Sequence, residues 1–211
     1  MVVSRPIKIG LLVLCASLCA LQAADTALVK AFENSFIHEK SRNYAKAIDD
    51  FKGKAIDASY EANLRLGWLL YCAGAYDSSI LYYKKAAMLM PYSEEAKFGL
   101  VMPLAAQGSW DRVIDAYKAI LTASPNNTMA NYRMGMVYFG RGDYEKALPY
   151  FQKLTELYPF DYDGLLMYAW TNLKLGKTRE AQALFDKVLL RSPRDTSALH
   201  GLQLLGVKTV H

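Results

Sequence analysis

The sequence predicts an all-α fold built from consecutive pairs of helices. Three observations predict it: prolines recur every 34 residues, glycines recur at the same interval, and apolar residues within each interval follow the 3, 4 and 7 spacing of one helix face. A bulky aromatic residue keeps step with them. These columns are Pro91, Pro125, Pro159 and Pro193; Gly74, Gly108, Gly142 and Gly176; and Tyr83, Tyr117, Phe151 and Phe185.

The composition suits one folded domain and excludes several other classes of protein. The chain has 211 residues, of which 53% are hydrophobic and 21% are charged, so it is large and apolar enough to bury a core. Three cysteines cannot form a disulfide framework. The formal net charge of +5 is too small for a strongly basic surface. We therefore expect that the protein has no nucleic-acid partner. We also expect that it is neither a multi-pass membrane protein nor a small module held together by disulfides.

Residues 1–23 are predicted to be a secretory signal peptide. Arg5 and Lys8 precede an apolar stretch of about a dozen residues, and small residues follow at the expected cleavage site after Ala23. Cleavage removes two basic residues, which leaves a net charge of 23 − 20 = +3, and it leaves Cys72 as the single cysteine. The alternative is that the segment is kept as an anchor, and we expect contact with a membrane only in that case.

The unit from Thr128 to Asp161 illustrates the elements within one repeat. Apolar and small residues mark one face of a first helix, which Gly142 is expected to end. Asp143 is expected to cap the second helix, Pro159 to end it and Asp161 to cap the helix that follows. Gly135 is expected to face Ala147, so that the two helices approach closely, with Phe151 filling the space toward the next pair.

The remaining elements follow in register. A degenerate first unit lacks the terminal proline and has Arg42 where glycine is usual. Pro103 falls inside a first helix, where it is expected either to kink the helix or to be tolerated as an irregularity. Residues 24–211 form the repeat domain, with units at about 28–59, 60–93, 94–127, 128–161 and 162–195 and a capping helix at about 196–205.

These columns resemble the tetratricopeptide repeat family. The family's pattern of Leu-Gly, Tyr, Ala, Phe, Ala and Pro is matched by Leu66-Gly67, Leu70, Ser79, Tyr83, Ala86 and Pro91; by Met134-Gly135, Tyr138, Ala147, Phe151, Leu154 and Pro159; and by Tyr168-Ala169, Ala181, Phe185, Val188 and Pro193. The resemblance implies a right-handed superhelical solenoid. Its first helices would line a concave groove that binds a peptide or partner protein.

The residues expected to face this groove are mostly apolar, which favours an apolar or amphipathic segment as ligand. The alternative is that several of them pack between adjacent first helices. Some members of the family grip a terminal carboxylate with Lys, Asn and Arg; Arg65 and Arg133 are candidate remnants, but apolar residues replace the other partners. The predicted groove residues are Phe32, Phe36, Leu64, Trp68, Phe98, Met102, Tyr132, Met136, Phe139, Leu166, Trp170 and Leu173.

No pattern of catalytic or ligand-binding residues accompanies the repeats. His38, His200 and His211 are scattered without the spacing of metal ligands, and Cys72 is interpreted as a packed thiol. The sequence has no glycine-rich phosphate loop and no Gly-x-Ser-x-Gly turn. We expect no enzyme activity, cofactor, metal or small-molecule substrate.

The combined interpretation is an exported scaffold or adaptor that binds a protein or peptide. The signal-like segment and the family resemblance favour the bacterial periplasm, in envelope assembly or secretion. The alternative is a permanent structural subunit of a large cell-envelope complex.

Overall fold

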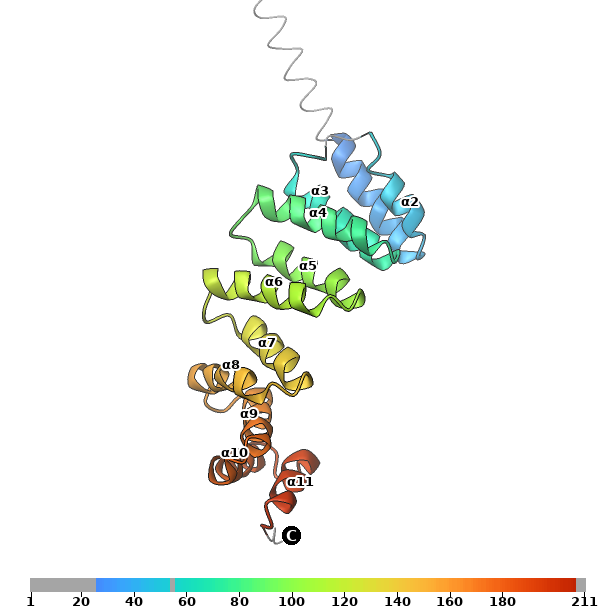
Figure 1. Cartoon of the computed structure of the whole chain (residues 1–211). Coiled ribbons are helices and arrows are strands. Elements are labelled where there is room, and N and C mark those ends of the chain that lie inside the picture. Colours follow the sequence, from blue (N-terminus) through green and yellow to red (C-terminus); the bar gives the residue numbers. More distant parts are fainter. Residues whose placement is uncertain (1–25, 54–55, 208–211) are drawn as a thin grey trace, which may run out of the picture. The chain divides into compact units, whose positions relative to one another are not determined.

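The computed structural model describes residues 26–53 and 56–207, and every regular element in these ranges is a helix (Figure 1). The predicted signal peptide, residues 1–23, lies outside the described residues. Two compact units divide the chain after Ser109. The first contains helical residues 26–40, α2 (Tyr44–Asp49), α3 (Tyr60–Cys72), α4 (Tyr76–Leu89) and α5 (Glu94–Ala106). The second contains α6 (Trp110–Ala123), α7 (Thr128–Gly140), α8 (Tyr144–Leu157), α9 (Tyr162–Lys174), α10 (Thr178–Arg191) and α11 (Thr196–Leu204).

Within each unit, helices that follow one another in the chain pack against one another. In the first unit α3 contacts α2, α4 and α5, and α4 contacts α5. In the second, contacts run from α6 through α11 between successive helices, and α9 also contacts α11. This nearest-neighbour pattern is that of an all-α solenoid of helix-turn-helix repeats, in which each repeat buries its apolar face against the next.

The turns between paired helices explain the glycine column. Gly142 has a φ of +78°, a left-handed conformation that glycine adopts without steric cost. Arg42 occupies the corresponding turn of the first repeat and has a φ of +57°. The same turn therefore forms there with a residue for which the conformation is unfavourable. The expectation that Arg42 replaces the usual glycine is confirmed.

Side-chain caps begin several helices, among them α3, α7, α9 and α11, whereas Ser93 before α5 makes no such hydrogen bond. Asp161 has an extended backbone and accepts a hydrogen bond of 2.7 Å from the Gly164 amide, as expected. The prediction for Asp143 is wrong: it occupies the cap position, but its side chain accepts no amide hydrogen bond. Its carboxylate instead pairs with Lys146 at 3.2 Å.

Each unit has its own apolar core. In both units a buried aromatic ring of the 34-residue column lies against a glycine. A Cβ atom at Gly135 would lie 2.7 Å from the ring of Phe151, so the small residue makes room for the aromatic ring itself. Two of the core clusters are Ala31, Ala47, Phe51, Ala62, Leu66, Leu69 and Leu70 in the first unit, and Leu165, Ala169, Ala181, Phe185, Val188, Ala198 and Leu202 in the second.

Pro103 is buried within α5, which runs uninterrupted from Glu94 to Ala106. Its ring nitrogen cannot donate the hydrogen bond that the Gly99 carbonyl would otherwise accept, so the helix continues across this position with one backbone hydrogen bond fewer. No turn opens at this proline, and a kink of the helix axis there stays a prediction.

Candidate peptide-binding surface

The predicted groove residues lie in pairs along the first helices of the repeats. The members of each pair are four residues apart, and Phe139 and Leu173 follow two of the pairs by three residues, so the residues within a helix share one face. All of them are at least partly exposed. Phe36, Trp68 and Met136 are the most accessible, with exposed fractions of 56%, 36% and 37%. The others, Phe32, Leu64, Phe98, Met102, Tyr132, Phe139, Leu166, Trp170 and Leu173, are half-buried.

Several of the half-buried side chains also contribute to the core. The ring of Phe32 meets Phe51 edge-on, with 5.2 Å between centroids. Trp170 meets Phe185 at the same distance and geometry, and its indole N–H donates to Ser197 Oγ at 2.9 Å. Substitution of either residue would therefore disturb packing as well as surface. Phe36, Trp68 and Met136 expose more of their surface, and of these Phe36 also contacts Arg65 and Trp68 also contacts Glu39.

Arg65 links Phe36 to Trp68 through Glu39. Its guanidinium lies 3.9 Å from the ring centroid of Phe36, and its Nη1 pairs with Glu39 Oε2 at 2.6 Å. The indole N–H of Trp68 donates to the other carboxylate oxygen of Glu39 at 2.5 Å. Phe36 and Trp68, predicted from sequence to share a surface, are thus joined through a buried ion pair.

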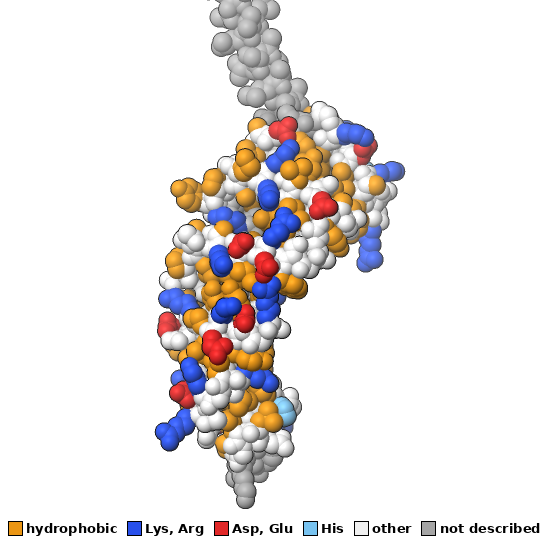
Figure 2. Space-filling model, in the orientation of Figure 1, with side chains coloured by type: hydrophobic (Ala, Val, Ile, Leu, Met, Phe, Trp, Pro, Cys, Tyr) orange, Lys and Arg blue, Asp and Glu red, His pale blue; other side chains and the backbone are white. Residues whose placement is uncertain are grey.

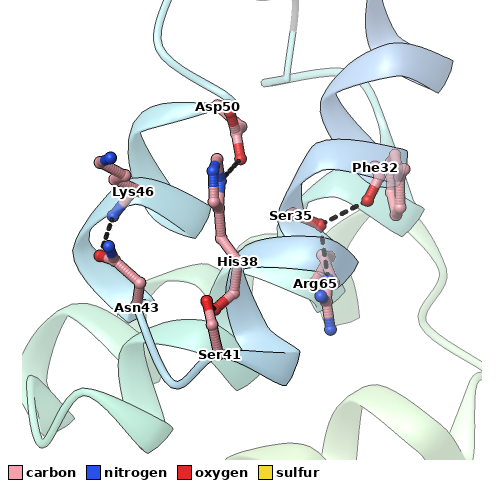
Figure 3. A network of polar contacts seen from close by, with 8 residues as sticks. All are labelled: Phe32, Ser35, His38, Ser41, Asn43, Lys46, Asp50 and Arg65. Carbon is pink, nitrogen blue, oxygen red and sulfur yellow. Dashed lines mark hydrogen bonds and ion pairs between the residues drawn. The ribbon is translucent and has the colours of Figure 1, made fainter.

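Ser35 accepts a further hydrogen bond from this arginine. Figure 3 shows Ser35 between the backbone of Phe32 and the side chain of Arg65. Its hydroxyl accepts from Arg65 Nε at 3.0 Å and donates to the Phe32 carbonyl at 2.7 Å. The same figure shows His38 turned away from this contact, toward Asp50, with 2.8 Å between Nδ1 and Oδ2.

The sequence reasoning missed Glu39 and Ser35. Glu39 lies 26 residues before Arg65 in the chain, so no local spacing relates the two side chains. The available signal was a pair of opposite charges on the first helices of successive repeats. As a result, the interpretation of Arg65 as a candidate remnant of a carboxylate grip changes: its guanidinium is already occupied by a carboxylate of this chain.

Arg133, the second candidate remnant, has a different environment. It is exposed and lines an open pocket of about 400 Å³ with Tyr132, Tyr158, Asp161 and Asp163. Burial and the nearby Asp163 carboxylate raise the pKa of Tyr132, so its hydroxyl stays protonated. The pocket combines one cation with two carboxylates, an arrangement unlike an all-basic site for a carboxylate.

The described residues lack a cluster of metal ligands and an activated thiol. Within residues 26–53 and 56–207 no cluster of three His, Cys, Asp or Glu side chains is placed to hold a metal ion. Burial, together with the Glu39 charge, raises the pKa of the Cys72 thiol, which disfavours the reactive thiolate. In the same ranges, no helix has the length and apolar character needed to cross a bilayer.

Comparison with known families identifies the repeat. Sequence models of the tetratricopeptide repeat match residues 37–94 and 98–162, and a further one matches residues 138–204. The chain belongs to the tetratricopeptide repeat family. Proteins of this family are generally scaffolds that bind protein or peptide partners, and neither matching model describes a catalytic family.

Two curated relatives share part of this sequence. The Protein CTR9 homolog of Arabidopsis thaliana is 26% identical over 132 residues, which is 62% of this chain and 12% of the relative. The TPR repeat-containing protein YpiA of Bacillus subtilis is 26% identical over 163 residues, which is 75% of this chain and 38% of the relative. The chain therefore spans well under half the length of either relative.

Solved structures support the fold. A tetratricopeptide repeat protein from Parabacteroides merdae has a TM-score of 0.69 at 18% identity, with 85% of this chain and 72% of that chain covered. The MamA protein has a TM-score of 0.65 at 20% identity, with 88% and 98% covered. YrrB, described as a TPR protein with an unusual peptide-binding site, has a TM-score of 0.63 at 18% identity, with 82% and 90% covered.

Proposed function

We propose that this protein is an exported scaffold or adaptor that binds an apolar or amphipathic peptide segment on the exposed faces of its first helices. The observation that carries the proposal is the set of accessible apolar side chains on those helices, of which Phe36, Trp68 and Met136 are the most exposed. Aromatic side chains are frequent energetic anchors of interfaces. Anchors repeated every four residues suit an extended or helical apolar segment.

The cellular setting is part of the same proposal. The basic start, apolar centre and small-residue exit of residues 1–23 support export. The setting proposed is the bacterial periplasm, in envelope assembly or secretion. Mass spectrometry of the protein from fractionated cells tests it: a periplasmic chain that begins at Ala24 is expected, whereas a cytoplasmic chain that retains Met1 would refute export.

A permanent structural subunit of an envelope complex is the second candidate, and exposed apolar side chains away from the first helices favour it. Met88, Tyr92 and Leu190 are 80%, 90% and 75% exposed, on second helices and on the turn after one. Figure 2 shows hydrophobic side chains at the surface among charged ones on the face that it draws. A fixed neighbour covering such side chains would bury them permanently.

Affinity capture from the cell envelope of the native organism separates the two candidates. The tagged full chain is compared with a Phe36→Ala/Met136→Ala variant. Both side chains are exposed, so the fold is expected to persist, as checked by circular dichroism. Recovery of the partner is expected to fall about tenfold or more, because truncation of interface anchors typically costs more than about 1 kcal/mol each.

The matched control is a Leu81→Ala/Leu190→Ala variant, which removes exposed apolar side chains from the second helices α4 and α10. Under the scaffold proposal it retains the partner at the parent level. Full recovery with the Phe36→Ala/Met136→Ala variant and loss with the control would reject the first-helix surface. That result would favour the structural subunit.

A further inference from the structure

We propose that Glu39 is a built-in ligand of Arg65 that determines the specificity of the first unit's surface. Its carboxylate occupies the guanidinium that a partner's carboxylate would otherwise use. The surface formed by Phe36 and Trp68 then accepts uncharged apolar side chains from within a partner's sequence and disfavours a terminal carboxylate. The inference rests on the proposed function in assuming that this surface binds a peptide.

The geometry of the ion pair is that of a bound carboxylate. Glu39 uses one oxygen to pair with Arg65 Nη1 at 2.6 Å and the other to accept from Trp68 Nε1 at 2.5 Å. The two donors lie one turn apart on α3, so they hold both oxygens from the same helix. The ligand in this site comes from the helix of residues 26–40 in the same chain.

Burial makes this internal carboxylate necessary. The Arg65 side chain is 8% exposed, and its Nη2 atom is buried without a hydrogen-bond partner among the described residues. A buried guanidinium that lost its counter-ion would be strongly destabilising. Burial alone would raise the pKa of Glu39, but hydrogen bonds from Trp68 and Arg65, with the charge of Arg65, hold that pKa below the ordinary 4.5.

The arrangement has a direct consequence for recognition. At neutral pH the Glu39 carboxylate is charged and neutralises Arg65, so a second carboxylate approaching this surface meets a negative charge and no available cation. The exposed ring of Phe36, which lies on the guanidinium, presents an apolar contact in its place. Charge complementarity therefore favours an uncharged apolar occupant.

Chemical rescue by acetate tests the role of Glu39. The substitution Glu39→Ala removes the carboxylate and leaves space beside Arg65 that opens to solvent, because the Glu39 side chain is 24% exposed. The midpoint of thermal unfolding is expected to fall. Sodium acetate at about 100 mM is then expected to raise it by about 2–4 °C relative to equal sodium chloride, the shift that about 1 kcal/mol of ligand binding produces in a chain of this size.

Three controls make the result specific. The wild-type protein is expected to show no rise in acetate over chloride, because its site is occupied. Acetamide, which has the shape of acetate without its charge, is expected to leave Glu39→Ala unchanged. The Glu39→Ala/Arg65→Met variant is expected to show no acetate effect. A response of the wild-type protein, or no response of Glu39→Ala, would overturn the proposal, as would an equal response of the double variant.

A second measurement uses the unmodified protein, so it does not depend on the folding of a variant. Fluorescein-labelled Leu-Phe-Leu-Phe-Leu is compared with a free carboxylate and with an amide at its C-terminus. The amide is expected to bind at least as tightly as the acid. An acid that bound about threefold more tightly, the effect of one favourable exposed ion pair, would overturn the role of Glu39. Binding of neither peptide would count against the proposed function, and the acetate result would then decide the role of Glu39.

Discussion

At the scale of single residues, the fit between a glycine and an aromatic ring determines how closely neighbouring helices approach. A Cβ atom at Gly201 in α11 would lie 2.2 Å from Cζ of Phe185, a separation that carbon atoms cannot adopt. Phe185 is fully buried and is held by Trp170, so its ring has little room to move. The glycine is therefore required for steric reasons.

The substitution Gly201→Ala is expected to lower the free energy of unfolding by about 1–3 kcal/mol, the usual cost of overpacking a core. Urea denaturation measures the loss. Gly140→Ala is the matched control in the same unit. A Cβ atom at Gly140 would meet nothing within 4 Å. Gly140 is the last residue of α7 and does not have a positive φ, so alanine fits its backbone conformation. This control is expected to be neutral or to stabilise by about 0.5 kcal/mol through helix propensity. Equal effects of the two substitutions would disprove the steric requirement.

At the scale of helices, polar contacts between residues about one repeat apart in the chain join successive repeats inside each of the two units. The hydroxyl of Tyr60 lies 2.7 Å from that of Ser93, just before α5, and the hydroxyl of Tyr162 donates to Asp195 at 2.6 Å, just before α11. Each tyrosine is the first residue of its helix, α3 or α9. Each partner is the residue immediately before the next helix but one, α5 or α11. The positions of the helices thus depend on polar contacts as well as on the core.

Helix α11 covers the last repeat, and it contains one buried and one exposed leucine. Replacing each of them by alanine separates the effect of lost burial from the effect of a changed helix propensity. Leu202 is 1% exposed within the core cluster of the second unit, whereas Leu204 is 59% exposed. Leu202→Ala is expected to lower the free energy of unfolding by about 2–5 kcal/mol, the range for a buried leucine. Leu204→Ala is expected to change it by less than about 0.5 kcal/mol. Chemical denaturation of both variants measures the difference, and similar losses would show that α11 does not cap the core.

The sequence predicted the elements of this fold better than the contacts between them. The glycine and proline columns predicted helix pairs and their turns because these depend on local backbone conformation, and Arg42 shows the same turn without glycine. The cap at Asp143 was predicted wrongly, because its position in the sequence does not reveal that its carboxylate pairs with Lys146 instead of a backbone amide. The link between Glu39 and Arg65 was missed because it depends on how two repeats pack. The exposed faces of the first helices were anticipated from spacing; what binds there stays a prediction.

At the scale of the whole molecule, contacts restricted to neighbouring helices imply that a local defect spreads only a short way. Each helix of the second unit contacts mainly the helices next to it in the chain, and the first unit has the same pattern. In such arrays stability is approximately a sum of repeat and nearest-neighbour contributions. Loss of packing at α11 should therefore lower protection against amide exchange near that end of the chain and leave distant helices unaffected.

Hydrogen exchange of the Leu202→Ala variant tests this expectation. Amide exchange in α9, α10 and α11 is expected to accelerate about tenfold or more, equivalent to at least about 1.4 kcal/mol, while α3 and α4 keep their wild-type rates. The acceleration is confined because the clusters that bury α3 and α11 share no residue. The Leu204→Ala variant controls for changes at the exposed face of α11. An equal acceleration in α3 and α4 would mean that the two units unfold as one cooperative body, and the additive description of the array would then be wrong.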